Sequence, residues 1–531
     1  MANLTRVIRN FYRDSVSLMQ LSARIAKMPG VTQASAVMAT ENNLALLREA
    51  GLLDRAAAAG PNDLLVALAG ESEEALAAAA AAGEAMLTEN AARARGGAGE
   101  IREPPRSLEM ALKELPAANL ALISTPGEYA AAEALKALKL GLNVMLFSDN
   151  VALADEVMLK RYAARHDLLV MGPDCGTAII GGIPLGFANV VRRGGIGVVA
   201  ASGTGLQQVT CLIDRHGMGI SQAIGTGGHD LHAEVGGITM QQGIAALAAD
   251  PATKVIVLIS KPPAPAVAEA VLASARRAGK PVVVNFLGAD PATLAGANLT
   301  AAKTLEDAAD AAVALARGEA RVVQAEVSSA TAAPPPPLPS QRFIRALYSG
   351  GTFCYEASLL LGEVLAPVFS NTPVGAAREL EDVWRSRAHT LVDLGDDLFT
   401  RGRPHPMIDQ RLRNERLLKE AADPEVAVVL LDVVLGYGSH PDPAGEIAPV
   451  VREALKEAAK GGRKLAVVGF VCGTAGDPQG LARQEEALRN AGMELSTSNA
   501  QAVRLAARIV GAADAAGALG DTPRSAKRLL P

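Results

Sequence analysis

Short apolar runs alternate with helical patterns over much of this chain. Apolar runs at residues 120–124, 143–147, 168–171, 196–201, 219–224, 255–259 and 282–286 are flanked by stretches in which apolar residues recur every three or four positions. Short apolar runs predict buried strands, and strands that alternate with helices predict parallel sheets with right-handed crossovers. Ligands of such sheets bind beyond the carboxyl ends of the strands, so the loops after these runs are the candidate site.

The first 95 residues predict a smaller module. Residues 6–12, 31–39 and 63–69 favour strands, and helices are expected from Asp14 or Ser15 to about Lys27, at 44–50 and at 71–87. This order of elements is typical of a small ferredoxin-like sandwich, with a Rossmann-like half as the alternative. Residues 93–105, rich in glycine and charge, predict a connector.

A proline-rich segment separates two larger parts of the chain. Four consecutive prolines within residues 319–341 predict an extended linker. A further α/β unit follows the linker, and the last twenty or so residues predict a loose tail. The predicted division is 1–95, 106–190, 194–318, 319–341 (linker), 342–511 and 512–531 (tail).

The units on either side of the linker share sequence anchors in the same order, which indicates an internal repeat with insertions in the second copy. Between the anchors, the segment at 224–228 lies opposite that at 394–397. The paired anchors are 202–204 with 349–352, 249–251 with 422–424, and 286–291 with 470–478.

One pair of anchors has the pattern of an anion site. The turn 202–205 (Ser-Gly-Thr-Gly) leads from a predicted strand into a predicted helix. The first N–H groups of a helix are unpaired and, with the helix dipole, favour a phosphate or carboxylate. Glycine allows close approach, and serine or threonine caps the helix or donates a further hydrogen bond. Glycines that only make room explain a single turn equally well, but the second copy at 349–352 (Ser-Gly-Gly-Thr) favours the anion site.

The repeat suggests how the two turns could work together. Similar domains usually pack about a pseudo-two-fold axis, which would bring the two helix starts to one cleft. A phosphate between two positive helix ends would be stabilised from both sides. Such an arrangement suits the transfer of a phosphoryl or acyl-phosphate group.

Composition excludes several classes of function. The 531 residues are 49% hydrophobic and carry a net charge of −5, which argues against a nucleic-acid partner. The start has no secretory signal and no apolar run is suited to cross a membrane, so a cytoplasmic protein without a membrane partner is expected. The four cysteines are far apart and form no CxxC pair, which predicts neither a disulfide framework nor a zinc ribbon.

Several loop residues could carry chemistry. His229 and His232 follow a predicted strand, and His229 is the candidate acid or base, with an exposed loop histidine as the alternative. His405 and His440 lie in predicted loops of the last α/β unit, where a histidine without a functional role is the more common case. Arg401 could bind a carboxylate, as could Arg403, although solvated arginines are the common case.

Acidic and thiol groups complete the set of candidates. Asp393, Asp396 and Asp397 could hold Mg²⁺, and helix capping explains them equally well. Cys175 is expected to be an inert buried residue. Cys354 lies in the first turn of the second predicted helix, where the helix dipole would lower the pKa of a thiol.

Several of these segments resemble a known family. GPDCG (172–176), GIGVVAASGTGLQQV (195–209), GTGGHD (225–230) and ADPATKVIVLI (249–259) resemble the alpha subunit of succinyl-CoA synthetase, and the part after the linker resembles the carboxyl-terminal domain of its beta subunit. With YSGGTFCYEA (348–357) and the proline-rich linker, the chain is similar over nearly its whole length to the FdrA family. The resemblance implies an α/β multi-domain fold: a Rossmann-like CoA-binding-type domain and two flavodoxin-like domains, after a small α/β module.

The chain also departs from the synthetases. Their phosphate-carrying histidine lies in a glycine-rich loop that corresponds to residues 288–298, where this chain has no histidine. Nothing resembles an ATP-grasp domain, and residues 9–15 do not match the loop that meets CoA. Of the synthetase features, the resemblance therefore still implies the acyl-phosphate cleft. CoA and Mg²⁺ are candidate cofactors only.

The FdrA resemblance implies a reaction that needs no nucleotide. Such proteins resemble the large component of an oxamate carbamoyltransferase of purine and allantoin breakdown, which works with smaller partner subunits and is expected to be oligomeric. The ligands would be an acyl phosphate or phosphate and a small carboxylate. The alternatives are an acyl-CoA synthetase subunit that borrows its nucleotide site from another chain, and a non-catalytic scaffold or metabolite sensor.

The candidate site residues fall into three groups, and no metal ligand is among them. They are His229 and Asp230 as catalytic residues; Ser202, Gly203, Thr204, Gly205, Ser349, Gly350, Gly351 and Thr352 as phosphate-binding residues; and Asp174, Cys175, Gly227, Gly228 and Asp396 as substrate-binding residues.

Overall fold

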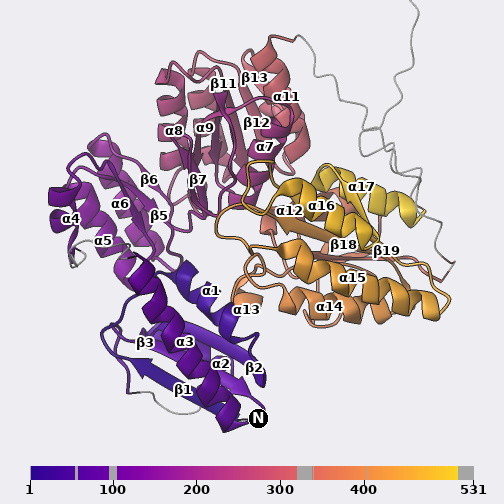
Figure 1. Ribbon diagram of the computed structural model, residues 1–531. Helices are drawn as coiled ribbons and strands as arrows, with labels where there is room; N and C mark the ends of the chain where they lie inside the picture. The colour runs from indigo at the N-terminus through magenta and orange to yellow at the C-terminus, as the bar shows by residue number, and fades with distance from the viewer. Residues whose placement is uncertain are drawn as a thin grey trace, which may run out of the picture. The chain divides into compact units, whose positions relative to one another are not determined.

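The computed structural model describes residues 2–53, 58–94, 105–319, 338, 340–401 and 403–511 (Figure 1). Most of the predicted connector and linker, and the whole predicted tail, lie outside these residues. The chain forms two compact units. The first contains Met1–Cys175, Thr226–Gln242 and Asp396–Asp409, and the second contains Gly176–Gly225, Gly243–Gly395 and Gln410–Pro531.

The first unit begins with a three-stranded antiparallel sheet in the order β1-β3-β2. Antiparallel pairing excludes the Rossmann-like alternative, and the described part of the module has the arrangement of a ferredoxin-like sandwich without a fourth strand. Asp14 caps the first helix by accepting from the N–H of Ser17, one of the two caps expected from the sequence. The elements are β1 (Ala2–Ile8), α1 (Ser15–Ile25), β2 (Val31–Met38), α2 (Glu41–Glu49), β3 (Leu64–Gly70) and α3 (Glu73–Ala94).

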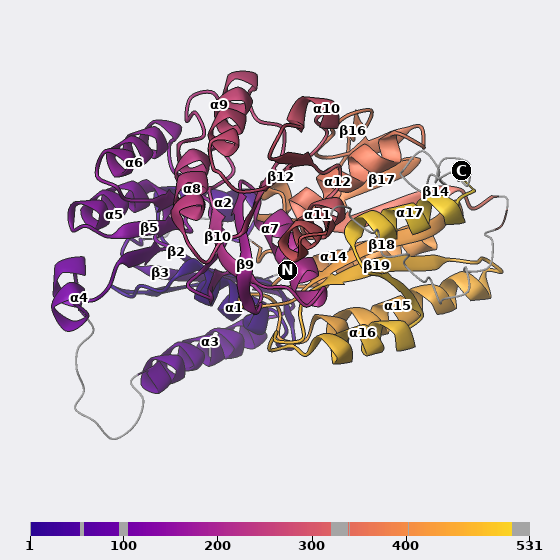
Figure 2. The ribbon, with the colours of Figure 1, turned by 90° about the horizontal axis from the view of Figure 1, so that it is seen from above.

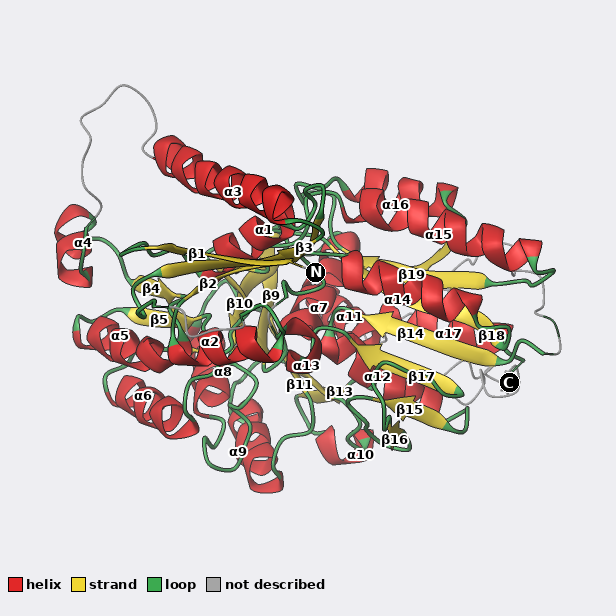
Figure 3. Cartoon of the chain, turned by 90° about the horizontal axis from the view of Figure 1, so that it is seen from below, coloured by secondary structure: helices red, strands yellow, loops and turns green. Residues whose placement is uncertain are grey.

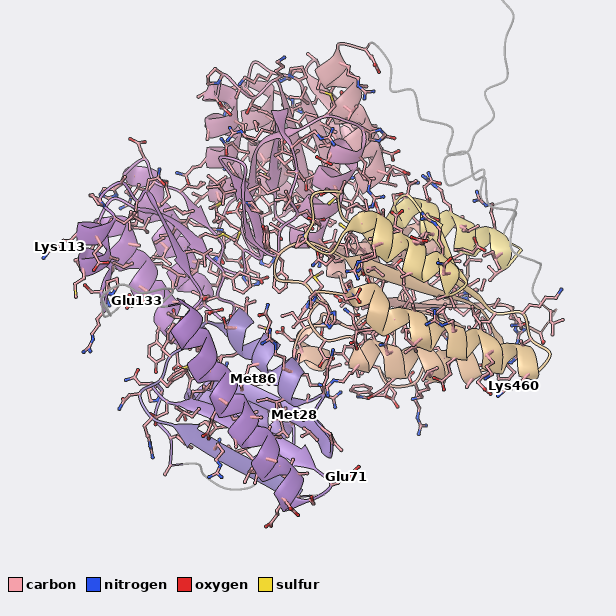
Figure 4. The ribbon with its side chains drawn as sticks, viewed as in Figure 1. Met28, Glu71, Met86, Lys113, Glu133 and Lys460 are labelled. Atoms are coloured by element: carbon pink, nitrogen blue, oxygen red, sulfur yellow. The ribbon has the colours of Figure 1, made fainter. Side chains whose placement is uncertain are left out.

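Helices cover both faces of this sheet. The central strand β3 is apolar throughout, and all of its residues are buried. Helices α1 and α3 share one core with residues such as Ile25, Val66 and Leu76. Met28 and Met86 pack at the margin of that core (Figure 4). Leu47 of α2 belongs to a second core on the other face. The module therefore has two hydrophobic cores, one on each face of the sheet, despite its small size.

The first unit continues with a small parallel sheet in the order β4-β5-β6. Alanines on α5 pack against it, which lets the helix approach the strands closely. The loops after the three strands lie at the carboxyl edge, where ligands of parallel sheets bind. The elements are α4 (Leu108–Glu114), β4 (Leu120–Ile123), α5 (Gly127–Lys139), β5 (Asn143–Leu146), α6 (Leu153–Arg165) and β6 (Val170–Met171).

The second unit contains two seven-stranded sheets, the first in the order β13-β12-β11-β9-β10-β7-β8. Helices α7 and α11 pack together on one face, and α8 and α9 lie on the other (Figure 2). The five parallel strands have the flavodoxin-like order 2-1-3-4-5. The elements are β9 (Arg193–Ala200), α7 (Gly203–Arg215), β10 (Ile220–Gly225), α8 (Ile238–Ala249), β11 (Val255–Ser260), α9 (Pro265–Arg276), β12 (Val282–Phe286), α10 (Pro291–Leu294), β13 (Leu299–Ala301) and α11 (Leu305–Arg317).

A hairpin that the sequence placed in the preceding domain extends this first sheet. β7 (Thr177–Ile180) and β8 (Ile183–Gly186) are joined by Gly181 and Gly182, and β7 pairs antiparallel with β10. Both glycines have positive φ, as a two-residue hairpin turn requires. The predicted boundary near residue 190 therefore differs from the fold, in which the hairpin belongs to the next sheet.

The second sheet of this unit has the order β16-β15-β17-β14-β18-β19-β20 and is parallel throughout. Figure 3 shows β15, β17, β14 and β18 side by side. Helices α12 and α17 pack together, as do α14 and α15. The elements are β14 (Phe343–Tyr348), α12 (Gly351–Gly362), β15 (Val368–Ser370), β16 (Arg378–Glu379), β17 (His389–Asp393), α13 (Asp397–Thr400), α14 (Arg411–Ala422), β18 (Val426–Val434), α15 (Pro443–Lys460), β19 (Ala466–Cys472), α16 (Leu481–Asn490), β20 (Met493–Ser496) and α17 (Asn499–Ile509).

The two sheets repeat one fold, as the sequence anchors indicate. In each, the first strand of the copy lies at the centre and is followed by a glycine-rich helix start. The Asp-Pro anchors form the same turn, because Asp250 accepts from the N–H of Ala252 and Asp423 from that of Glu425. The second copy carries the additional strands β15 and β16, which extend the sheet beyond β17 and explain the greater length of that copy. Among the described residues, no helix combines the length and apolarity that a membrane crossing requires.

A buried glutamate joins the two copies and makes stability depend on pH. Glu356 of α12 accepts hydrogen bonds from the N–H of Leu305 (2.7 Å) and from Nδ2 of Asn499 (2.8 Å). Burial raises the pKa of Glu356 to about 7. An unfolded glutamate titrates near pH 4.3. The proton on Glu356 therefore favours folding fully below that pH, and this contribution is lost as the pH rises to about 7.

We expect Glu356→Gln to remove much of this pH dependence. Between about pH 4 and 7 the free energy of unfolding of the wild type should fall by about 3 kcal/mol more than that of the variant, from the shift in pKa. Urea unfolding at a series of pH values measures the difference. Glu363→Gln, which changes an exposed glutamate at the end of α12, should retain the wild-type slope. Parallel curves for the wild type and Glu356→Gln would contradict the expectation.

Candidate functional site

The first predicted phosphate turn begins helix α7. Ser202 is the N-cap, and its Oγ accepts from the N–H of Gly205 at 3.0 Å. Gly203 is exposed, so the N–H end of the helix is open to a ligand. A Cβ at Gly205 would lie 2.6 Å from Ser202 Oγ, which explains the need for glycine there. β9 and its neighbour β11 diverge into crossovers on opposite sides, so this turn lies at the topological switch point of the sheet.

The second predicted turn begins helix α12, but its polar groups have different hydrogen-bond partners. Gly350 is the N-cap and no side chain caps the helix. Asp432 of β18 accepts from the N–H of Ser349 (2.8 Å), from its hydroxyl (2.6 Å) and from the N–H of Gly350 (3.0 Å). Arg413 Nη1 lies 2.9 Å from the same carboxylate. The donors of Ser349 and Gly350 assigned to phosphate from sequence are thus used by an internal carboxylate.

The two turns meet, as the internal repeat led us to expect. Ser202 Oγ and Thr352 Oγ1 lie 2.6 Å apart, within hydrogen-bond distance. A Cβ at Gly350 would lie 3.0 Å from Cγ2 of Thr204. Both turns belong to the second unit, so the two helix starts form one continuous surface.

The electrostatics of the two helix starts differ. Besides Asp432, Asp393 lies against α12, because a Cβ at Gly351 would be 2.6 Å from its Oδ2. No acidic residue lies in the first turn of α7. A bound anion is therefore expected to rest on the N–H groups of α7, with the Thr352 hydroxyl as the contribution from α12.

A cation near this surface was not predicted from sequence. Lys261 directly follows β11, and its Nζ lies 5.5 Å from the centroid of the ring of Tyr355, the fifth residue of α12. That distance suits a cation–π contact. Its position in the sequence could have indicated this cation. β11 is the parallel neighbour of β9, so Lys261 and Ser202 follow adjacent strands at the same edge of the sheet.

Predicted substrate residues of the first unit come together in two loops. Gly227 has a φ of 85°, and a Cβ there would lie 2.2 Å from the carbonyl oxygen of Pro173. A Cβ at Gly228 would lie 3.6 Å from Oδ2 of Asp174. Asp174 is exposed, whereas Cys175 is buried, as expected for most cysteines, so its side chain is not accessible for the substrate-binding role also assigned to it.

Asp230 does not have the setting of a catalytic group. It is fully buried, and its two oxygens accept from the N–H groups of Thr239 (3.1 Å) and Met240 (2.9 Å) at the start of α8. Lys160 Nζ lies 2.8 Å from Oδ1. The carboxylate therefore serves a helix start and a buried ion pair, and we replace the catalytic assignment of Asp230 with a structural one.

His229 has a more open setting. Its side chain is 56% exposed, and Nδ1 lies 3.5 Å from Oε2 of the buried Glu156. The ring of His232 lies 5.0 Å away, centroid to centroid. Neither Glu156 nor Lys160 was predicted from sequence, because both occur in a helix without any motif.

The remaining candidates mostly have local roles. Asp396 caps α13 by accepting from the N–H of Leu398, so helix capping explains it. Nδ1 of His405 accepts from the N–H of Met407, and Nδ1 of His440 from that of Asp442. Arg401 lies 3.7 Å from Glu49. Among the described residues, no group of three or more His, Cys, Asp or Glu is placed to hold a metal ion.

The expectation that the helix dipole lowers the pKa of the Cys354 thiol is wrong. Cys354 is fully buried in α12, and burial raises the pKa of its thiol far above the ordinary value. The desolvation of a thiolate outweighs the helix dipole at this position. The other three cysteines are also buried, and none of the four forms a disulfide.

Three family models match the chain. The CoA-ligase model matches residues 347–509, the CoA-binding domain model matches residues 192–288, and the AllF heavy metal-associated domain model matches residues 1–104. The first two cover most of the two flavodoxin-like copies. Residues 1–104 contain neither cysteine nor histidine, so the sequence of that module has no thiolate or imidazole ligand for a heavy metal.

Individual proteins are also similar to this chain. The chain is 44% identical over 513 residues to YahF of Escherichia coli K12, which covers 94% of this chain and 97% of YahF. It is 30% identical over 164 residues to the alpha subunit of the ADP-forming succinate–CoA ligase of Aquifex aeolicus, with 29% of this chain and 51% of that subunit covered. PH0766 of Pyrococcus horikoshii matches over 78% of this chain and 88% of its own, at 15% identity and a TM-score of 0.34.

Proposed function

Because this chain belongs to the FdrA family and has its succinyl-CoA synthetase-like fold, we propose that it is the large component of an oxamate carbamoyltransferase. The reaction exchanges carbamoyl phosphate and oxamate with oxalurate and phosphate. Smaller partner subunits are part of the proposal. Carbamoyl phosphate is an acyl phosphate, so the reaction needs an anion site but no nucleotide.

The observation that supports this most is the contact between the two helix starts. Ser202 and Thr352 place two hydroxyl groups 2.6 Å apart beside the open N–H groups of α7. These donors suit the phosphate of an acyl phosphate, whose negative charge grows as the carbon–oxygen bond breaks. Lys261 supplies a positive charge near α12. The site therefore favours a phosphate leaving group.

Proton and electron balance is simple for this reaction. The amide nitrogen of oxamate forms a bond to the carbamoyl carbon, and the bond from that carbon to the phosphate oxygen breaks with its electron pair on phosphate. A base accepts the proton that the nitrogen loses, and His229 is the residue proposed for that role. The released phosphate takes up one proton from solvent, which balances the reaction. The loop after β12 has no histidine to carry a phosphoryl group, and Asp290 there caps α10.

The test is phosphorolysis of oxalurate by the purified chain together with its partner subunits. We expect oxalurate to disappear only when inorganic phosphate is present, with carbamoyl phosphate and oxamate formed in equal amounts. Omission of phosphate, and separately of this chain, provides the controls. Absence of phosphate-dependent loss of oxalurate would overturn the proposal.

An acyl-CoA ligase subunit is the second candidate. The CoA-ligase and CoA-binding family models and the similarity to a succinate–CoA ligase alpha subunit favour it. The phosphate site would then serve an acyl phosphate on its way to CoA. Calorimetric titration with CoA and with ATP separates the two, because saturable binding of either favours the ligase.

A further inference from the structure

A buried ionic cluster in the first unit leaves one carboxylate oxygen without a hydrogen bond. Lys160 Nζ lies 2.7 Å from Glu156 Oε1, 2.8 Å from Asp230 Oδ1 and 3.0 Å from the carbonyl oxygen of Thr226. These contacts use all three donors of the ammonium group. Glu156 is 1% exposed, yet its Oε2 has no hydrogen-bond partner among the residues that the structure describes. Buried polar atoms in native proteins nearly always have one, so this oxygen needs an explanation.

The free oxygen faces the exposed histidine. Glu156 Oε2 lies 3.5 Å from Nδ1 of His229, an ion-pair distance that exceeds an ordinary hydrogen bond. One ammonium and two carboxylates give the cluster a formal charge of −1, so it attracts a donor or a positive charge at this point. Catalytic hydrogen bonds are often long before a ligand binds.

We propose that Glu156 is a positioning residue that keeps the proton of neutral His229 on Nδ1 and so leaves Nε2 as a proton acceptor. A carboxylate behind an imidazole fixes both ring orientation and tautomer in this way. Lys160 holds Glu156, and the capping bonds of Asp230 hold Lys160 in turn. A ligand with an N–H or O–H beside the loop that contains Asp174 is the substrate class that this acceptor suits.

The role of Nε2 as acceptor of a proton from the substrate rests on the proposed function. The tautomer of His229 does not depend on it. In the carbamoyl transfer, the proton leaves the oxamate nitrogen as the nitrogen–carbon bond forms, and Nε2 of His229 accepts it. His229 then releases the proton to solvent, and the departing phosphate takes up one proton in exchange. No oxidant, reductant or further reactant is needed.

Nitrogen-15 NMR of the histidines in the full-length protein tests the tautomer directly. In alkaline buffer, where the ring is neutral, we expect the proton of His229 on Nδ1 in the wild type. Glu156→Gln keeps Oε1 for Lys160 and presents an amide N–H at the place of Oε2, so the proton should move to Nε2. His229→Asn assigns the signal. Asp155→Asn, on the same helix, should leave the tautomer unchanged.

Turnover provides the second readout. In oxalurate phosphorolysis Glu156→Gln should lower kcat about 10- to 100-fold with little change in KM, and His229→Asn should lower it about 100- to 10,000-fold. Combining the two should cost no more than His229→Asn alone, because Glu156 acts through His229. If Glu156→Gln does not fold, Glu156→Asp retracts the carboxylate and should give a mixture of tautomers.

The outcomes separate the two proposals. A wild-type proton on Nε2, or a tautomer that Glu156→Gln leaves unchanged, overturns the role of Glu156 whatever the turnover. An equal fall in turnover for Asp155→Asn overturns it as well. If the tautomer responds as expected but the wild type shows no phosphorolysis, the transferase proposal fails and the positioning role stands.

Discussion

Ser202→Asp is expected to weaken phosphate binding strongly while the protein remains folded. Aspartate is as good an N-cap as serine, so its carboxylate can accept from the N–H of Gly205 and keep the start of α7. The same carboxylate can accept from the hydroxyl of Thr352, which lies 2.6 Å from Ser202 Oγ. A fixed negative charge then stands where the phosphate would bind.

The expected effect of Ser202→Asp is large because like charges repel strongly at such a site. Two unit charges about 4 Å apart near a protein surface interact by about 4 kcal/mol, which corresponds to a loss of about 100- to 1,000-fold in phosphate affinity. Calorimetric titration with inorganic phosphate measures the affinity, and a thermal melt checks the fold. Turnover of oxalurate should fall in parallel.

Two further variants make the result specific. Ser202→Gly removes the hydroxyl at a cost of only a few tenths of a kcal/mol in capping and should weaken phosphate binding about tenfold or more. Ser107→Asp changes the exposed N-cap of α4 in the same way and should leave binding unchanged. Wild-type phosphate affinity in Ser202→Asp would show that the anion does not rest on α7.

Arg413→Met is expected to destabilise the protein by about 3–5 kcal/mol, the usual cost of leaving a buried charge without its partner. Arg413 is 1% exposed, and its Nη1 lies 2.9 Å from Oδ1 of Asp432. Burial alone lowers the pKa of Arg413, and Asp432 opposes that shift by attracting the positive charge. Without the guanidinium, Asp432 keeps three donors from Ser349 and Gly350 but loses its counter-charge.

Urea unfolding followed by circular dichroism measures the effect of Arg413→Met. Arg452→Met, on the exposed side of α15, is the matched control and should change stability by no more than about 0.5 kcal/mol. Replacing both Arg413 and Asp432 by apolar residues should recover only part of the loss, because the donors of Ser349 and Gly350 would then be unpaired. An effect of Arg413→Met as small as that of Arg452→Met would contradict this account of the second helix start.

The sequence by itself determined the local elements and their order. The cap at Asp14, the Asp-Pro turns at Asp250 and Asp423 and the glycine-rich starts of both helices could be predicted, because each depends on residues a few positions apart. The repeat then predicted that the two helix starts meet, and the contact between Ser202 and Thr352 confirms it. Similar sequences adopt similar folds, so the correspondence between the two helix starts could be inferred from the sequence alone.

Only the tertiary structure decided which partners the polar groups of the site have. Asp432 reaches Ser349 from a strand 83 residues away, and Lys160 meets Asp230 across 70 residues. No local pattern encodes such pairings, because they depend on how strands and helices pack and on which carboxylates become buried. That packing closes part of the second phosphate turn, gives Asp230 a structural role and places Glu156 behind His229.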